Sequence, residues 1–292
     1  MNSGYSNNSN NFNQFSSNNN VAGNRDFLNS NSLIAKFAFL LLVIILFVMA
    51  LRLGSSILSW IFSPSQNPIL INGMVDAKQM LVIPQDPSVK GAIPIMRSVN
   101  DAQGMEFTWS VWIYIDDFVY KQNEYKHVFH KGNDDINVTN PPVGLNYPNN
   151  APGLYITPET NDLLVIMNTF DTINETVLIK DIPLNKWLNV IIRLDNQHQL
   201  DIYINGTLTK RHMLNGVAKQ NYGNVYVSMN GGFSGYTSGL RYFDSALGTN
   251  RIQQIVNKGP NMKMNSSDIN NTKPHYLSSR WYFAGSNDEY NP

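Results

Sequence analysis

Carboxylate side chains are the first candidates for chemistry in this 292-residue chain, because two of them can together hydrolyse a glycosidic bond. A retaining pair must lie about 5 Å apart, so both carboxylates have to face the same site. Three candidate pairs can be read from the sequence: Glu106 and Asp116, Glu159 and Asp162, and Glu175 and Asp181. The first pair brackets a strand-like segment at its two ends, the second lies in a turn-like stretch, and the third consists of isolated residues. We therefore predict that the protein is not an enzyme.

Histidine and cysteine add no predicted metal or nucleophile site. Cysteine is absent, which excludes disulfides, thiolate metal sites and a cysteine nucleophile. His127 and His130 are three residues apart in a strand-like segment, and this spacing places two side chains on opposite faces of a strand. We therefore predict that they share no metal ion. The sequence also has no glycine-rich phosphate-binding loop.

Aromatic residues in loops are candidates for ligand binding, because sugar-binding sites pair an aromatic surface with fixed polar groups. Tyr147 lies in a proline-rich loop over residues 140–152, and Phe233 and Tyr236 lie in a second predicted loop. The alternative is that these rings pack their own loops against the domain.

Five Asn-x-Ser/Thr sequences that follow the membrane segment are candidate glycosylation sites: Asn137, Asn174, Asn205, Asn265 and Asn270. Asn205 also has a structural explanation, because Asn205-Gly206 between two strand patterns predicts a tight hairpin turn. In a chain this rich in Asn, several such sequences arise by chance.

Composition divides the chain into three segments. Residues 1–32 contain 12 Asn and 7 Ser, which leaves too little apolar surface to offset the entropy of ordering, so a disordered tail is predicted. Residues 33–51 carry one charge, Lys36, and at about 1.5 Å per residue a helix of this length crosses a bilayer core. Residues 53–62 have one apolar helical face and are predicted to extend that helix along the membrane surface. The alternative is the end of a shifted span, which would bury Arg52 at a cost of several kcal/mol. Residues 63–292 form a folded domain with a C-terminal tail.

The membrane segment 33–62 is predicted to be a single-pass anchor, since its apolar run is too long for a signal peptide. Arg25 and Lys36 precede this run and Arg52 follows it, which favours a cytoplasmic N-terminus with the domain across the membrane. The absence of cysteine instead fits a domain that never relies on an oxidising compartment. These two indications conflict, and the sequence leaves the orientation open.

Alternation of apolar and polar residues predicts antiparallel strands throughout the domain. It is clearest over residues 107–115, where every second side chain is large and apolar. Further strands are predicted over residues 125–131, 162–169, 187–194, 200–204, 207–209, 224–229, 238–243 and 276–284. One helix is expected, capped by Thr249 and ended by Gly259-Pro260. Many short strands with one late helix indicate an all-β fold, an antiparallel two-sheet jelly-roll sandwich.

Four motifs in this order resemble the core of concanavalin A-like lectin/glucanase domains of the laminin-G-like type. They are FTWSVW at 107–112, KWLNV at 186–190, LDIYING at 200–206 and GLRYF at 239–243. The resemblance extends over about residues 70–262. It implies two curved antiparallel sheets packed face to face, and it leaves the ligand open, because this fold hosts lectins, hydrolases, adhesion modules and structural proteins. The Glu-x-Asp-x-(x)-Glu strand of the glucanases is missing.

The same resemblance implies a candidate calcium site, because such domains often hold Ca²⁺ at one rim. Calcium requires six to eight oxygen ligands, and Asp134 and Asp135, with Asn133 and Asn137, stand in one polar loop. The alternative is that two adjacent Asp residues only form a turn. No other cofactor is predicted.

Two functions fit this organisation. The first is a membrane-anchored, non-enzymatic lectin-like or adhesion module whose ligand is a glycan or a protein. The second is a structural protein that contacts neighbouring subunits, since an Asn-rich tail, one membrane span and a cysteine-free jelly roll are similar to membrane proteins of large DNA viruses. Nucleic acid is not a predicted partner, because the formal net charge is zero.

Overall fold

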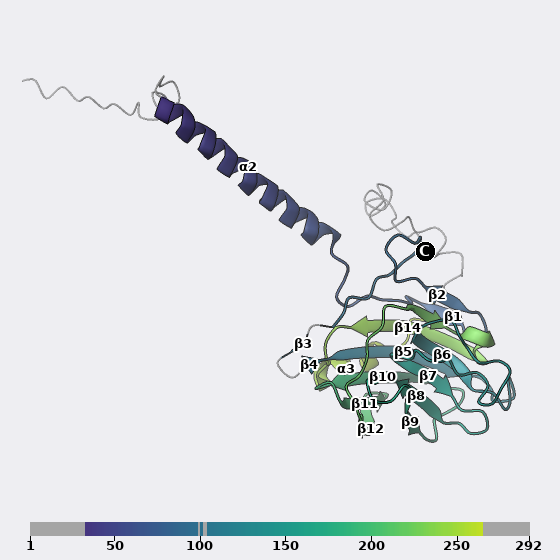
Figure 1. The fold of residues 1–292 in the computed structure, drawn as a ribbon. Coiled ribbons are helices and arrows are strands. Elements are labelled where there is room, and N and C mark those ends of the chain that lie inside the picture. The colour runs from purple at the N-terminus through teal and green to yellow at the C-terminus, as the bar shows by residue number, and fades with distance from the viewer. Residues whose placement is uncertain (1–32, 99, 102–103, 265–292) are drawn as a thin grey trace, which may run out of the picture. The chain divides into compact units, whose positions relative to one another are not determined.

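The structure is a computed structural model that describes residues 33–98, 100–101 and 104–264 (Figure 1). The chain divides into two compact units, Met1–Ser63 and Pro64–Pro292. The predicted tail 1–32 and the predicted last strand 276–284 lie outside the described residues.

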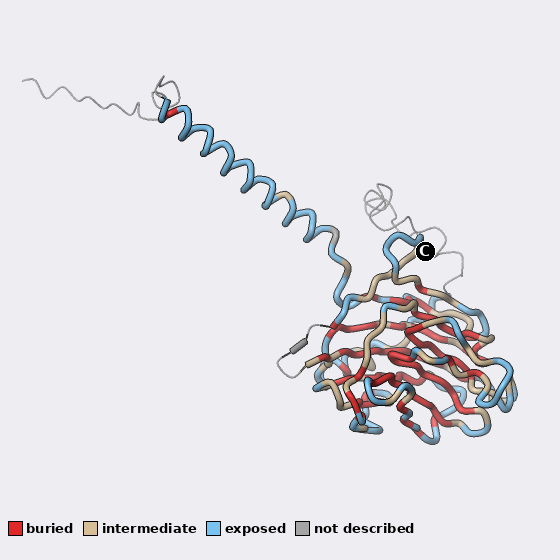
Figure 2. Tube along the Cα trace, viewed as in Figure 1, coloured by how far each residue is buried: buried red, intermediate tan, exposed pale blue. Residues whose placement is uncertain are grey.

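The first unit contains the helix α2 (Leu33–Phe62), which continues for 30 residues without a break. Its side chains are almost all exposed although they are apolar (Figure 2). A helix of this length measures about 45 Å, which is longer than a bilayer core of about 30 Å. Within the described part of the chain, α2 is the one helix long and apolar enough to cross a membrane, a test that signal sequences also pass. The expected surface extension over residues 53–62 is a continuation of this helix.

The second unit is a sandwich of two antiparallel sheets, which confirms the predicted fold class. The first sheet has the order β1 (Met74–Asp76), β14 (Gly235–Phe243), β5 (Phe107–Ile115), β10 (Trp187–Asp195), β11 (Gln199–Ile204) and β12 (Thr207–Met213). The second has the order β2 (Leu81–Ile83), β13 (Asn224–Val227), β6 (Lys126–Gly132), β7 (Gly153–Ile156), β8 (Leu163–Met167) and β9 (Glu175–Ile179). The remaining elements are the hairpin β3 (Asn100–Asp101) and β4 (Gly104–Met105), the 3-10 turn η1 (Met229–Gly231) and the helix α3 (Thr249–Lys258).

The core lies between the sheets and follows the alternation in the sequence (Figure 2). On β5, the predicted inward residues from Phe107 to Ile115 are all buried in it. Trp109 at the centre stacks on Phe129 of the facing sheet with ring centroids 5.3 Å apart, and meets Tyr242 edge-on at 5.2 Å. Burial of such large rings, each worth a few kcal/mol, holds the two sheets together.

Two local predictions have different outcomes. The turn between β11 and β12 is Asn205-Gly206, with φ of 49° and 81°, as the predicted tight hairpin requires. The helix α3, however, is capped by Gly248 and not by the Thr249 side chain. Its N-terminus makes no side-chain capping bond, and it is held to the outer face of the first sheet by Ile252, which is fully buried.

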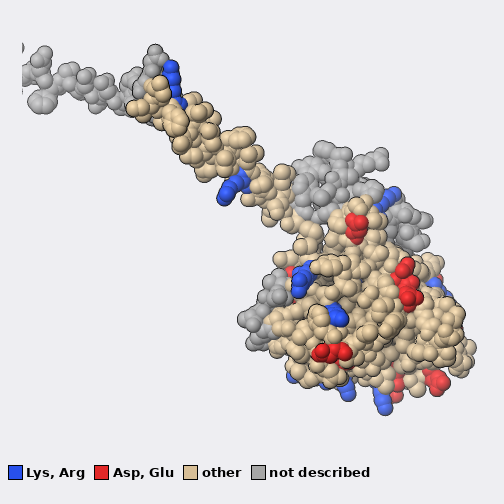
Figure 3. Space-filling model, in the orientation of Figure 1, with Lys and Arg blue, Asp and Glu red and all other residues tan. Residues whose placement is uncertain are grey.

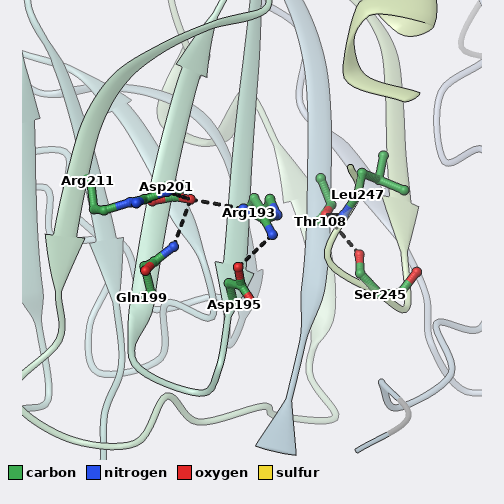
Figure 4. Close-up of polar contacts among 8 residues, drawn as sticks. All are labelled: Thr108, Arg193, Asp195, Gln199, Asp201, Arg211, Ser245 and Leu247. Atoms are coloured by element: carbon green, nitrogen blue, oxygen red, sulfur yellow. Dashed lines mark hydrogen bonds and ion pairs between the residues drawn. The ribbon is translucent and has the colours of Figure 1, made fainter. Parts of the chain in front are cut away.

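A charged cluster occupies the outer face of the first sheet (Figure 4). The buried Asp201 carboxylate accepts hydrogen bonds from Arg211 Nε at 2.7 Å, Arg193 Nη1 at 3.0 Å and Gln199 Nε2 at 3.1 Å. Arg193 also donates to Asp195 at 2.6 Å. The charge of Asp201 is therefore compensated by two guanidinium groups on the neighbouring strands.

The substitution Asp201→Asn should destabilise the sandwich by about 3 kcal/mol, since removing one member of a buried pair leaves its partner uncompensated. The matched control Asp195→Asn should cost less than half as much, because Arg193 keeps its bond to Asp201. Thermal melts followed by near-UV circular dichroism measure both effects. Equal losses for the two variants would contradict this account of the cluster.

Candidate ligand-binding pocket

A cavity of about 280 Å³ opens at one end of the sandwich, between the two sheets. Its walls come from β5 and β14 of the first sheet, from β6 of the second, and from the loops that connect strands at this end. Loops held by a rigid sheet are the usual place for binding. The volume is close to the lower limit of small-molecule pockets, which run from roughly 300 to 1,000 Å³.

The floor of the pocket is aromatic and belongs to the core. Phe107, Trp109 and Tyr242 line it. The Tyr242 hydroxyl is buried and has no hydrogen-bond partner of good geometry among the described residues. Burial, and then the charge of Asp244, raise the pKa of Tyr242 against a smaller opposing effect of the Gln220 amide. The hydroxyl therefore stays protonated and can donate a hydrogen bond.

A lysine from β6 supplies the buried positive charge of the pocket. The Lys131 side chain is largely buried, and its ammonium donates to the Gly223 carbonyl oxygen at 2.6 Å. Burial lowers the pKa of Lys131 to about 8, so the group is still mostly charged at neutral pH. Lys131 makes no ion pair with any residue that the structure describes.

Two exposed aromatic rings stand on the wall of the pocket. Phe170 is 68% exposed and Tyr222 is 88% exposed, and both line the cavity. The Lys219 ammonium lies over the Phe170 ring at 4.9 Å from its centroid. Exposed rings beside a cavity provide flat apolar faces, while Gln220, whose side chain donates to Ser98 Oγ at 3.0 Å, adds a polar group.

A family model described as the concanavalin A-like lectin/glucanases superfamily matches residues 90–253, which is more than half of the chain. The chain belongs to this superfamily. The match confirms the resemblance drawn from the four motifs, and it includes most of the strands that build the pocket. No curated protein matches the sequence.

Among solved structures, this superfamily member is similar to receptor-binding domains of botulinum neurotoxins. The domain of neurotoxin D matches with a TM-score of 0.42 and 12% identity, over 56% of this chain and 38% of that chain. The domain of a C/D mosaic serotype matches with a TM-score of 0.41 and 13% identity, over 55% of this chain and 37% of that chain. The serotype G binding domain matches with a TM-score of 0.41 and 16% identity, over 54% of this chain and 37% of that chain. The chain thus spans less than two fifths of these domains, and the likeness says nothing about its ligand.

The three aromatic residues predicted to bind ligand do not line this pocket. Tyr147 is half exposed in its loop, where its carbonyl oxygen accepts from Asn133. Phe233 is 0% exposed and belongs to the core, so its ring is closed off from ligand and the prediction is wrong for this residue. Tyr236 lies on β14 and not in a loop, and its ring is 6.4 Å from that of Tyr114.

The candidate calcium loop is held by its own hydrogen bonds. Asp134 and Asp135 are exposed, and the Asn133 side-chain oxygen already accepts from Asn146 and Asn149. Within the described residues, no group of three or more acidic or histidine side chains is placed to hold a metal ion. Calcium at this loop stays a prediction.

The candidate glycosylation sites differ in accessibility. Asn205 is exposed at the hairpin turn, but its side-chain oxygen accepts from the Asn189 N–H at 2.8 Å. Asn137 is partly exposed, and its amide bonds the Asn140 carbonyl within one loop. Asn174 is also partly exposed. Asn265 and Asn270 lie outside the described residues.

His127 and His130 lie on the same face of β6, so the prediction that they lie on opposite faces was wrong. The pairing of β6 with β7 shifts between His127 and Phe129, which is a β-bulge. Val128 and Phe129 both enter the core, and the two histidines meet on the outer face. The alternation rule fails here because one extra residue interrupts it.

The two histidine rings form a directed chain of hydrogen bonds. His127 Nδ1 accepts from the Met229 N–H at 3.0 Å, so its proton is on Nε2 and points to His130 Nδ1 at 2.6 Å. His130 Nε2 then donates to the Asn133 carbonyl at 2.7 Å. Both rings are neutral in this arrangement, and every ring nitrogen is used. Each ring nitrogen is thus engaged in a hydrogen bond, and the absence of a shared metal ion stays a prediction.

This part of the structure should lose stability as pH falls from about 6.5 to 4. Burial lowers the pKa of His130 to about 4 and, together with the neighbouring ring, lowers that of His127 well below its usual range. In the unfolded chain both histidines take up protons near pH 6.5, so acid favours unfolding, by about 2 kcal/mol at pH 5 for His130 alone. The charge of Asp134 raises the pKa of His130, but less than burial lowers it, so the loss of stability in acid remains.

Thermal melts at pH 7 and pH 5 measure this effect in the parent and in His130→Gln, whose amide oxygen can accept from His127 but does not titrate. The difference between the two pH values should be smaller in this variant. His198→Gln, at a partly exposed histidine outside the pair, is the control and should behave as the parent does. Identical pH dependence in the parent and His130→Gln would refute the explanation.

Proposed function

We propose that this protein is a non-enzymatic binding module of the lectin type that is anchored in a membrane by α2. The ligand, a glycan, occupies the pocket at the end of the sandwich. One observation carries the proposal, namely a cavity with aromatic walls and a few fixed polar groups, which is the composition of sugar sites. The superfamily contains lectins and glucanases, so the choice between them depends on the site.

The positions of the acids favour binding over hydrolysis. A glucanase needs two carboxylates at its cavity, and none of the residues that line this pocket within the described structure is Asp or Glu. Two buried acids are engaged elsewhere. Glu175 binds His212 Nε2 at 2.8 Å and the Asn215 N–H at 3.1 Å, and Asp201 binds its two arginines.

The alternative is a structural protein of a virion or an inner membrane whose sandwich contacts neighbouring subunits. The strand β12 offers a surface for this, because it is an exposed edge of the first sheet. Yet Lys210 and Arg211 stand on that strand, and charges on an edge discourage pairing with another chain. In Figure 3, the sandwich surface in view carries few charges, with both signs scattered. The face in view therefore has no positive patch of the kind that attracts nucleic acid.

The aromatic wall can be tested by a double substitution. The variant Phe170→Ala/Tyr222→Ala should bind at least tenfold more weakly than the parent to whichever glycans the full chain, in detergent micelles, retains on a glycan array. Both rings are exposed, so the melting temperature should not change. Tyr147→Ala is the matched control at another exposed tyrosine and should bind as the parent does. Retention of no glycan at all, with stable self-association on a sizing column, would favour the structural alternative.

The anchor can be tested by extraction of membranes that contain the full chain. An apolar helix of this length should remain in the membrane in alkaline carbonate and leave it only with detergent. Mass spectrometry of the extracted protein should find α2 in the mature chain. Release by carbonate, or a mature N-terminus beyond residue 62, would identify the helix as something other than an anchor.

A further inference from the structure

The charged residues that line the pocket in the described structure are both basic. Lys131 and Arg97 line the cavity, and Lys219 lies over the Phe170 ring at its wall. None of the three forms an ion pair with a residue that the structure describes. The chain as a whole has no excess of positive charge, so this clustering is a local property of the site.

Among these basic residues, Lys131 is the buried one that lines the cavity. Lys131 is only 7% exposed. Its ammonium donates one hydrogen bond, to the Gly223 carbonyl oxygen. An ammonium has three donors, which leaves two for another partner. A buried cation without a counter-charge is costly, and an anionic group in the cavity would offset that cost.

The other residues that line the pocket indicate which kind of anion fits it. A small inorganic anion would leave the rings of Phe107 and Trp109 without contact. The Tyr242 hydroxyl and the Gln220 carbonyl oxygen are buried and make no hydrogen bond of good geometry with the described residues, so they provide one donor and one acceptor for neutral hydroxyl groups. A ligand that matches all of these residues has a charged oxygen group for the lysine, hydroxyls for the polar groups, and an apolar ring face for the aromatic rings.

We propose that the pocket binds a carboxylated sugar, such as a uronic or sialic acid, with its carboxylate on Lys131. This inference rests on the proposed function and names the ligand class of the same site. The sugar ring lies over the aromatic floor, its hydroxyls bond Tyr242 and Gln220, and Arg97 and Lys219 attract the anion toward the opening. The volume of about 280 Å³ limits the buried part to a small ligand, with any further residues of a glycan on Phe170 and Tyr222.

The test uses the full chain in detergent micelles and a printed array in which each glycan that carries a uronic or sialic acid stands beside its neutral counterpart. The parent should retain the carboxylated member of a pair at least tenfold more strongly. Lys131→Met removes the charge and keeps an apolar side chain of similar length, so this preference should disappear. Lys186→Met, at an exposed lysine that does not line the cavity, should leave the preference unchanged.

A second measurement separates this role from a structural one. If Lys131 served only to tie β6 to the Gly223 carbonyl, Lys131→Met would lower the melting temperature. A binding lysine that lacks a counter-charge predicts an unchanged or higher melting temperature in that variant. In the parent, free glucuronate should raise the melting temperature, while glucose and acetate at the same concentration should not.

The outcomes distinguish the two proposals. Equal retention of neutral and carboxylated glycans, lost in Phe170→Ala/Tyr222→Ala, would overturn the carboxylate assignment and leave the glycan-binding function standing. An effect of acetate as large as that of glucuronate would reduce the site to a simple anion site and would also overturn it. Retention of no glycan would refute both.

Discussion

One extra residue in the strand β6 determines which of its side chains reach the candidate pocket. The bulge between His127 and Phe129 makes Val128 and Phe129 both point into the core. After the bulge the alternation resumes, so His130 points outward and Lys131 points inward, where it pairs across the sheet with the core residue Val225. Without the bulge, a regular strand could not place both histidines outside and Lys131 in the cavity.

The bulge is stabilised on both faces of the second sheet. Inside, Phe129 stacks on Trp109 at the centre of the core, which fixes its position along the strand. Outside, the histidine pair is bonded to the Met229 N–H at one end and to the Asn133 carbonyl just after β6 at the other, and the His130 ring stacks on Tyr226 with centroids 5.1 Å apart. A slip by one residue would bury polar rings and expose Phe129, so the register that presents Lys131 to the pocket is strongly determined.

The architecture could be predicted from the sequence, because strand alternation and hairpin turns are local properties. The inward residues of β5 and the Asn205-Gly206 turn follow from patterns a few residues long. The bulge in β6 leaves no such pattern, since an insertion of one residue looks like an imperfect strand. The pocket could not be predicted either, because its walls come from loops far apart in the sequence. Phe170 and Tyr222 did carry a signal, as single aromatic residues within polar stretches, but nothing local indicates that they line one cavity.

The contrast between the buried charges is what distinguishes the pocket from the rest of the sandwich. Asp201 has two arginines, and Glu175 has His212 and a backbone N–H. Lys126, which is also buried, has the charges of Glu124 and Asp117 to raise its pKa against the effect of burial. For Lys131, burial acts alone. Since Asp201 and Lys126 have opposite charges near them within the chain, the lysine at the cavity that has none is the position where a counter-charge from outside the chain is expected.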